Sequence, residues 1–168
     1  MSHSELIPGM FHTLAWYNRQ VNQAIAELAS KYGEVFARAG TTHFGSATEL
    51  LFHIVDSDVV WLRRLWLGVD PAPTAPDRGD GSPERWSTVR EALDSRIAAY
   101  CGGLTAENLA EEVSYANSAG TRYTQPRWQC LLHMFNHQTH HRGQIAQVLD
   151  EHGVTNDYSN LVWYLRDE

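Results

Sequence analysis

Apolar residues recur every three or four positions in four long segments of the chain, which is the spacing of one face of an α-helix. The segments cover residues 6–31, 46–67, 83–101 and about 124–153, and each ends near a glycine, a residue that often follows the last helical turn. A short last helix is predicted over 157–166. The pattern therefore predicts an all-α fold, a four-helix bundle formed by residues 1–168 as a single domain.

Each predicted helix has one apolar stripe that we expect to face the core. The stripes consist of Met10, Phe11, Leu14, Tyr17, Val21, Ile25 and Leu28; of Leu50, Leu51, Ile54, Trp61, Leu62 and Leu65; of Trp86, Val89, Leu93, Ile97 and Tyr100; of Leu131, Met134, Phe135, Ile145, Val148 and Leu149; and of Leu161, Val162 and Leu165 in the last helix.

The connections differ in character. Residues 33–45 contain three glycines and predict a loop with a short turn, in which His43 is a surface histidine. Ser46 and Glu49 form a capping-box pattern at the start of the second helix. Residues 68–82 are rich in Pro and Gly, and they predict a long surface connection after the second helix, because neither half of the chain alone would bury its helices. Residues 113–123 can form an extended pair with a turn.

Charge and composition exclude several classes of partner. The net charge is −7 and no basic run occurs, which disfavours binding to nucleic acid or to anionic membranes. The first residues do not resemble a secretion signal, and no apolar run approaches the length of a membrane span. We therefore expect a cytoplasmic protein with no membrane contact. The two cysteines, Cys101 and Cys130, form no CxxC motif and are expected to be free, partly buried thiols.

Four of the nine histidines lie in residues 131–144 of the fourth predicted helix. Helix geometry places His137 and His141 toward the apolar stripe, one turn apart, and His133 and His140 toward solvent. Imidazoles at positions i and i+4 can hold one metal ion, although such a pair can equally be two ordinary polar residues. A third ligand from another helix would decide between these interpretations. Among the remaining histidines, His53 alone lies well inside a long helix beside an apolar stripe.

His53, His137 and His141 are therefore the predicted metal ligands. Around them, Asn136 and Gln144 could either orient imidazoles or face solvent. Asp58 falls within the apolar stripe of the second helix, where a carboxylate needs a partner unless the predicted face is off by a third of a turn. Arg142 is the first candidate for that partner. It could instead hold an anionic substrate or form an ion pair on the helix surface.

Two segments resemble a known family. They are His53-Ile-Val-Asp-Ser-Asp58-Val-Val-Trp61-Leu62 and Leu132 to Ile145, which contains His137-Gln-Thr-His140-His141-Arg142-Gly143-Gln144. Together they are similar to the DinB/YfiT-like superfamily of bacterial four-helix-bundle metalloproteins. That family's signature is a histidine in the second helix followed later by His-x-x-x-His-Arg-Gly-Gln. Trp16-Tyr17-Asn18 and the closing Tyr158 to Leu165 segment also fit its pattern.

The resemblance implies that His53, His137 and His141 bind one divalent metal ion and that the bundle forms a homodimer. It also implies a small-molecule substrate, because the family includes thiol-dependent transferases and isomerases as well as hydrolases. Three imidazoles with an open coordination position suit Zn(II), and Ni(II) also accepts imidazole ligands. The absence of Glu-x-x-His pairs argues against a di-iron site, and no HExxH motif is present.

Three functions remain open for such a site. The metal could activate a low-molecular-weight thiol in a transferase-like reaction, which the family resemblance favours. It could instead activate water, as in a metal-dependent hydrolase. The third alternative is a non-enzymatic, stress-related bundle that holds a structural metal.

Overall fold

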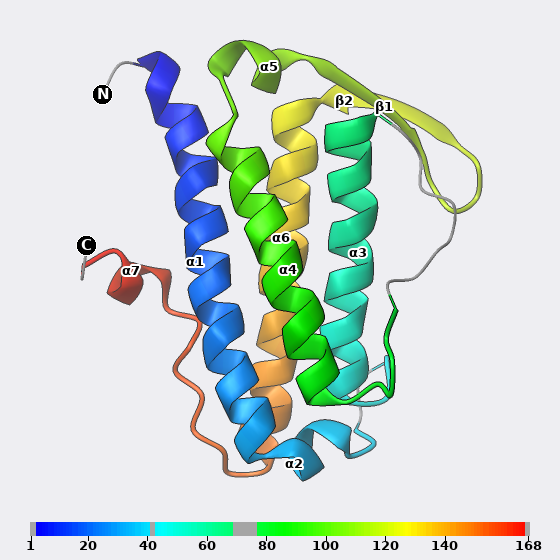
Figure 1. The fold of residues 1–168 in the computed structure, drawn as a ribbon, viewed down its shortest axis with the longest axis vertical. Coiled ribbons are helices and arrows are strands. Elements are labelled where there is room, and N and C mark those ends of the chain that lie inside the picture. The colour runs from blue at the N-terminus through cyan, green and yellow to red at the C-terminus, as the bar shows by residue number, and fades with distance from the viewer. Residues whose placement is uncertain (1–2, 41–42, 69–76, 167–168) are drawn as a thin grey trace.

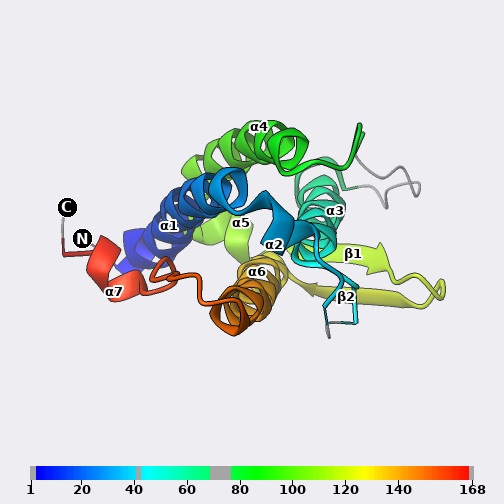
Figure 2. The same cartoon turned by 90° about the horizontal axis from the view of Figure 1, so that it is seen from below.

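A computed structural model describes residues 3–40, 43–68 and 77–166, and it confirms the all-α fold (Figure 1). The bundle consists of four long helices, α1 (His3–Lys31), α3 (Ala47–Leu67), α4 (Pro83–Gly102) and α6 (Arg127–Glu151). Figure 2 shows the four helices arranged around a common core, with α1 packed against α4 and α3 packed against α6.

The long helices do not simply alternate in direction. In Figure 1, α1 and α6 run downward, whereas α3 and α4 both run upward. A connection between two parallel neighbours must return along the bundle. With 21 residues, α3 is about 31 Å long, and residues 68–82 could span about 50 Å if extended. The predicted Pro- and Gly-rich connection is therefore long enough, although residues 69–76 lie outside the described residues. No helix in the described part of the chain has the length and apolar character needed to cross a membrane.

Two short elements lie at the upper end of the bundle in Figure 1. They are α5 (Ala106–Ala110) and a hairpin of β1 (Glu112–Ala116) and β2 (Arg122–Pro126). The strands are antiparallel, with Tyr115 opposite Tyr123, and this confirms the predicted extended pair. In the turn, the side-chain oxygen of Asn117 accepts hydrogen bonds from the backbone of Ala119 and Thr121, and Gly120 adopts φ 80°, which glycine tolerates best.

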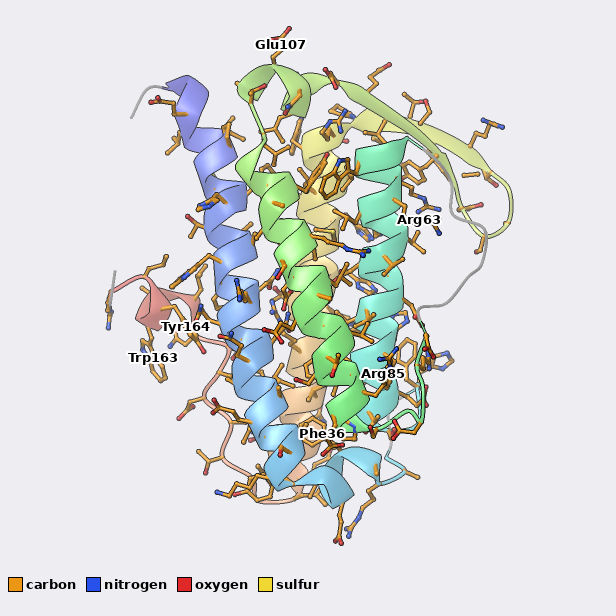
Figure 3. The ribbon with its side chains drawn as sticks, in the orientation of Figure 1. Phe36, Arg63, Arg85, Glu107, Trp163 and Tyr164 are labelled. Atoms are coloured by element: carbon orange, nitrogen blue, oxygen red, sulfur yellow. The ribbon has the colours of Figure 1, made fainter. Side chains whose placement is uncertain are left out.

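The lower end is closed by α2 (Gly33–Ala37), where the sequence predicted only a loop with a turn. Phe36 of this helix is completely buried and points into the end of the bundle (Figure 3). Burial of one aromatic side chain gives this short segment the tertiary contact that a five-residue helix needs, because so short a helix is not stable alone.

Serine caps begin two of the long helices. Ser46 accepts a hydrogen bond from the backbone N–H of Glu49 at 3.1 Å, as the capping-box pattern predicted. Ser82 accepts one from Arg85 at the same distance, with Pro83 at the first helical position. These bonds satisfy amide groups that have no partner within the first turn, so each helix begins at a defined residue.

The core follows most of the predicted stripes, with corrections at both ends of the chain. Met10 is 57% exposed, although it was predicted to face inward. The last helix is only α7 (Leu161–Tyr164), and Val162 and Leu165 are exposed. One turn of helix can present only one side to the bundle. Tyr164 takes this role and packs edge-on against the Tyr17 ring at 5.5 Å (Figure 3).

The carboxylate of Asp58 is completely buried, as its place in the apolar stripe predicted. Its partner is Arg90 of α4 rather than Arg142. Arg90 Nη1 lies 2.6 Å from Asp58 Oδ2, and Gln138 Nε2 donates to the same oxygen at 2.7 Å. No ion pair joins Arg142 to Asp58 in the described part of the chain. Arg90, rather than Arg142, reaches Asp58 because α4 also faces the core at the level of Asp58.

Removal of the Arg90 side chain should destabilise the folded protein. We expect Arg90→Ala to lower the free energy of unfolding by about 3–5 kcal/mol, because it leaves Asp58 buried without its counter-charge. Arg85→Ala is the control, since Arg85 pairs with the exposed Asp77 at the edge of the bundle (Figure 3) and should cost no more than about 1 kcal/mol. Urea denaturation measures both, and equal losses would contradict the expectation.

Candidate metal centre

The three predicted ligands meet on the side of the bundle where α3 faces α6. His53 projects from α3, and His137 and His141 project from successive turns of α6. His137 Nε2 lies 3.2 Å from His53 Nε2 and 3.1 Å from His141 Nε2. The ligand atoms that the three residues offer all lie within 4.8 Å of one another. The structure thus brings together the three histidines that the sequence selected.

These separations suit a single ion. Two nitrogens bound tetrahedrally to one zinc ion at 2.0–2.1 Å lie about 3.3 Å apart. The two spacings to His137, 3.2 and 3.1 Å, are close to this value, and all three ligand atoms lie within 4.8 Å of one another. Three protein ligands also leave one tetrahedral position open, which is the arrangement of catalytic rather than structural zinc sites.

Gln144 orients one of the imidazoles. Its Oε1 lies 2.7 Å from His141 Nδ1. Because an amide oxygen only accepts hydrogen bonds, this contact requires the proton of His141 on Nδ1 and leaves the lone pair of Nε2 directed at the other two rings. Of the two residues that the sequence offered for this role, Gln144 therefore fills it, whereas Asn136 is exposed.

Phe44 covers the centre from the loop before α3. Its ring stacks on His53 with 4.2 Å between centroids and meets the edge of His141 at 5.4 Å. An apolar side chain on two ligands restricts the access of water and limits the rotation of both imidazoles. The sequence analysis missed this residue, because nothing in a glycine-rich loop indicates that one aromatic residue folds back over a helix.

Further aromatic rings lie along α3 and α6 between the three histidines and the hairpin. His133 is exposed and lies one turn before His137, with 6.0 Å between their ring centroids. The ring of His133 also meets Trp61 of α3 at 5.0 Å. His140 and His43 are exposed, as predicted, and neither belongs to the group of three.

The carboxylate nearest in sequence to His53 forms an ion pair through one of its two oxygens. Asp56 and Glu49 of α3 both form ion pairs with Arg78, which lies in the connection between α3 and α4. The Arg78 guanidinium also lies over the Phe52 ring at 5.2 Å. Asp56 is therefore held by a cation through Oδ2, whereas its buried Oδ1 has no hydrogen-bond partner in the described part of the chain.

Arg142 lies in the core and not on the helix surface. Only 3% of its surface is exposed, and its guanidinium lies over the Tyr17 ring at 5.5 Å from the centroid. Its Nη2 is 3.5 Å from Thr139 Oγ1, and burial lowers its pKa. The possible role of Arg142 in holding an anionic substrate stays a prediction.

Burial keeps the three imidazoles neutral. It is the largest cause that lowers the pKa of each of them, and the neighbouring imidazoles lower the pKa of His137 further, to about 4. For His141 the contact with Gln144 partly opposes this effect. Histidine binds metal ions in its neutral form, so a site whose rings resist protonation is available to a cation at neutral pH.

The lowered pKa values predict how the metal-free protein responds to acid. Above about pH 6.5, His137 is neutral in both the folded and the unfolded chain and contributes no pH dependence. Between about pH 6.5 and about pH 4 the unfolded chain binds a proton that the folded chain does not, so the free energy of unfolding should fall as the pH falls. Urea denaturation across this range measures the loss, which should be smaller in His137→Gln. An equal loss in both proteins would contradict the assignment.

Comparison with known proteins agrees with this architecture. The model of the DinB family matches residues 1–168. A DinB-like protein from Bacillus cereus has a similar fold, with a TM-score of 0.60 and 17% identity over 82% of this chain and 89% of that one. Another, from Bacillus subtilis, has a TM-score of 0.60 and 21% identity over 84% and 92%. We found no match among the curated proteins. The chain, matched over its whole length, belongs to the DinB family.

Proposed function

We propose that the protein binds one divalent metal ion, Zn(II) or Ni(II), through His53, His137 and His141. We further propose that it is an enzyme in which the ion activates a low-molecular-weight thiol for transfer to a small-molecule substrate. The observation that carries the proposal is the convergence of three Nε2 atoms from two helices. Membership of the DinB family supports it.

A divalent ion held by three neutral ligands keeps its full charge and can lower the pKa of a thiol or a water molecule that reaches it. The residues of the chain prepare this chemistry. Burial keeps the imidazoles unprotonated, Gln144 holds His141 with Nε2 facing the centre, and Phe44 excludes water from one side. Each of these contacts exists before the ion arrives, so little rearrangement is needed on binding.

The thiol must come from outside the chain. Both cysteines are free and buried, and burial raises the pKa of Cys101 to about 12 and also raises that of Cys130. Neither side chain belongs to the histidine group, and neither readily forms a thiolate at neutral pH. This favours a small thiol as co-substrate over a nucleophilic cysteine of the protein.

A metal-dependent hydrolase is the second candidate. Hydrolysis uses the same ion and usually a general base near the attacking water. Asp56 pairs with Arg78 through Oδ2, while its buried Oδ1 has no hydrogen-bond partner in the described part of the chain, so the preference for thiol chemistry rests on the family resemblance. A non-enzymatic bundle with a structural ion is the third candidate, but a three-ligand site on a packed core has less need of an ion for folding.

Metal analysis tests the first part of the proposal. Protein purified without a histidine tag should contain about one ion per chain, and His53→Ala or His137→Ala should contain almost none, because two imidazoles hold a divalent ion much more weakly than three. His140→Ala is the matched control. It removes an exposed imidazole adjacent to His141, and metal content should be unchanged. Equal metal content in all four proteins would place the ion elsewhere.

Removal of the ion should leave the bundle intact. The long helices pack through a continuous apolar core, so a chelator should abolish bound metal with little change in helical circular dichroism. A structural ion would instead be required for folding, and the helical signal would then disappear together with the metal.

A reaction screen separates the two enzymatic candidates. The metal-loaded protein should conjugate small thiols to electrophilic substrates, and His53→Ala should lose the activity, because the ion that activates the thiol is lost. Ester and amide substrates without added thiol test hydrolysis. Turnover that does not depend on thiol would favour the hydrolase, and turnover in neither assay would favour the non-enzymatic alternative.

Two further proposals rest on the family resemblance and the composition. The first is a homodimer, for which the exposed Trp128 and Leu132, one turn apart on α6, offer apolar surface. Light scattering gives the mass in solution and would contradict the homodimer if it gave the mass of one chain. The second is a cytoplasmic location, which cell fractionation tests.

A further inference from the structure

Five buried polar side chains cross the bundle as one connected cluster, with at least one from each long helix. Asn22 of α1 donates to both carboxylate oxygens of Asp94 at 3.1 Å, and Arg90 Nη2 lies 2.8 Å from Asp94 Oδ1. Arg90 Nη1 reaches Asp58 Oδ2 on α3, and Gln138 on α6 donates to the same oxygen. We call this group the polar cluster.

Net stability does not explain the polar cluster. Removing carboxylates and a guanidinium from water costs several kcal/mol per ion, and their attraction within the protein often does no more than offset that cost. Apolar residues of similar size would often serve as well in a core. Charged groups add geometric specificity, because a hydrogen bond forms only within a narrow range of distances and angles and so restricts the relative position of the two helices that it joins.

One link of the polar cluster joins the two helices that carry the metal ligands. Gln138 follows His137 on α6, and Asp58 lies five residues after His53 on α3, which is about 7.5 Å along the helix. A slide of α3 against α6 by one residue, about 1.5 Å, would break the 2.7 Å bond between Gln138 and Asp58. The same slide would separate His53 from the two rings on α6.

We propose that Gln138 is a positioning residue for the metal centre. Its hydrogen bond to Asp58, which Arg90 holds in place, fixes the axial register of α3 against α6 and so keeps His53 opposite His137 and His141. This inference rests on the proposed function, because the register matters most if the three imidazoles share an ion.

Gln138→Met tests the proposal with little disturbance of the core. Methionine has nearly the same length and shape, and Gln138 Oε1 is buried with no partner in the described part of the chain. The substitution therefore removes the donor to Asp58 together with an unsatisfied acceptor, and the free energy of unfolding should change little. Metal affinity, measured by competition with a chromophoric chelator, should fall at least about tenfold, as it does when residues that support ligands are lost.

The visible spectrum of bound Co(II) gives a readout that a merely structural role would not move. Four-coordinate Co(II) absorbs much more strongly than the five- or six-coordinate ion. A displaced His53 should lower this absorbance in Gln138→Met at saturating metal. An unchanged spectrum together with wild-type affinity would overturn the proposal.

Two further variants distinguish a changed register of α3 against α6 from a general loosening of the core. Asn22→Leu cuts the polar cluster at its other end, between α1 and α4, and should leave metal affinity within about twofold of wild type although it costs more stability than Gln138→Met. Asp58→Leu removes the same link from the α3 side, and Arg90 keeps Asp94 as its counter-charge. This variant should weaken metal binding as Gln138→Met does.

The outcomes are distinguishable. Equal weakening by Asn22→Leu and Gln138→Met would show that any damage to the core loosens the site, and would overturn the register proposal. If Gln138→Met does not fold, Asp58→Leu decides by the same affinity criterion, and a crystal structure of either variant gives the separation of His53 from His137. If the wild-type protein binds no metal, the proposed function fails, whereas an unchanged separation of these two residues in the metal-free variants would refute the register role itself.

Discussion

The buried carboxylate of Asp58 is the constraint on which the arrangement of the bundle depends. Its Oδ2 atom receives Arg90 from α4 and Gln138 from α6, so three helices meet at one oxygen. Apolar side chains pack at many relative positions, but a charge without water needs partners at defined distances and angles. The apolar stripes therefore decide that the helices associate, and the polar cluster selects how they align.

The histidine group depends on that alignment, because its members come from both sides of the contact between α3 and α6. Within α6, the spacing of His137 and His141 follows from the helix alone. The position of His53 relative to them is a tertiary property. Phe44 and Gln144 then restrict the rings locally, so the centre combines one long-range constraint with two short-range ones.

The sequence predicted the four long helices and the three histidines, because both depend on periodicity, which is a local property. It did not predict the partner of Asp58, since Arg142 and Arg90 are equally plausible until the helices are placed in space. A signal existed for Arg90 and Asp94. They lie one turn apart among Trp86, Leu93 and Ile97, so a stripe that was treated as apolar contained two opposite charges. The short α7 and the fold of Phe44 over His53 depend on contacts between segments distant in sequence, which no periodicity encodes.

The distance along the sequence between the three histidines determines when the site can form during synthesis. His53 and His137 are 84 residues apart, so a ribosome completes three of the four long helices before the second ligand is made. An ion bound as proposed could therefore not nucleate the early collapse of the nascent protein, because the three imidazoles come together only when α6 has docked. Metal content would then report how much of a cellular population has reached the final fold.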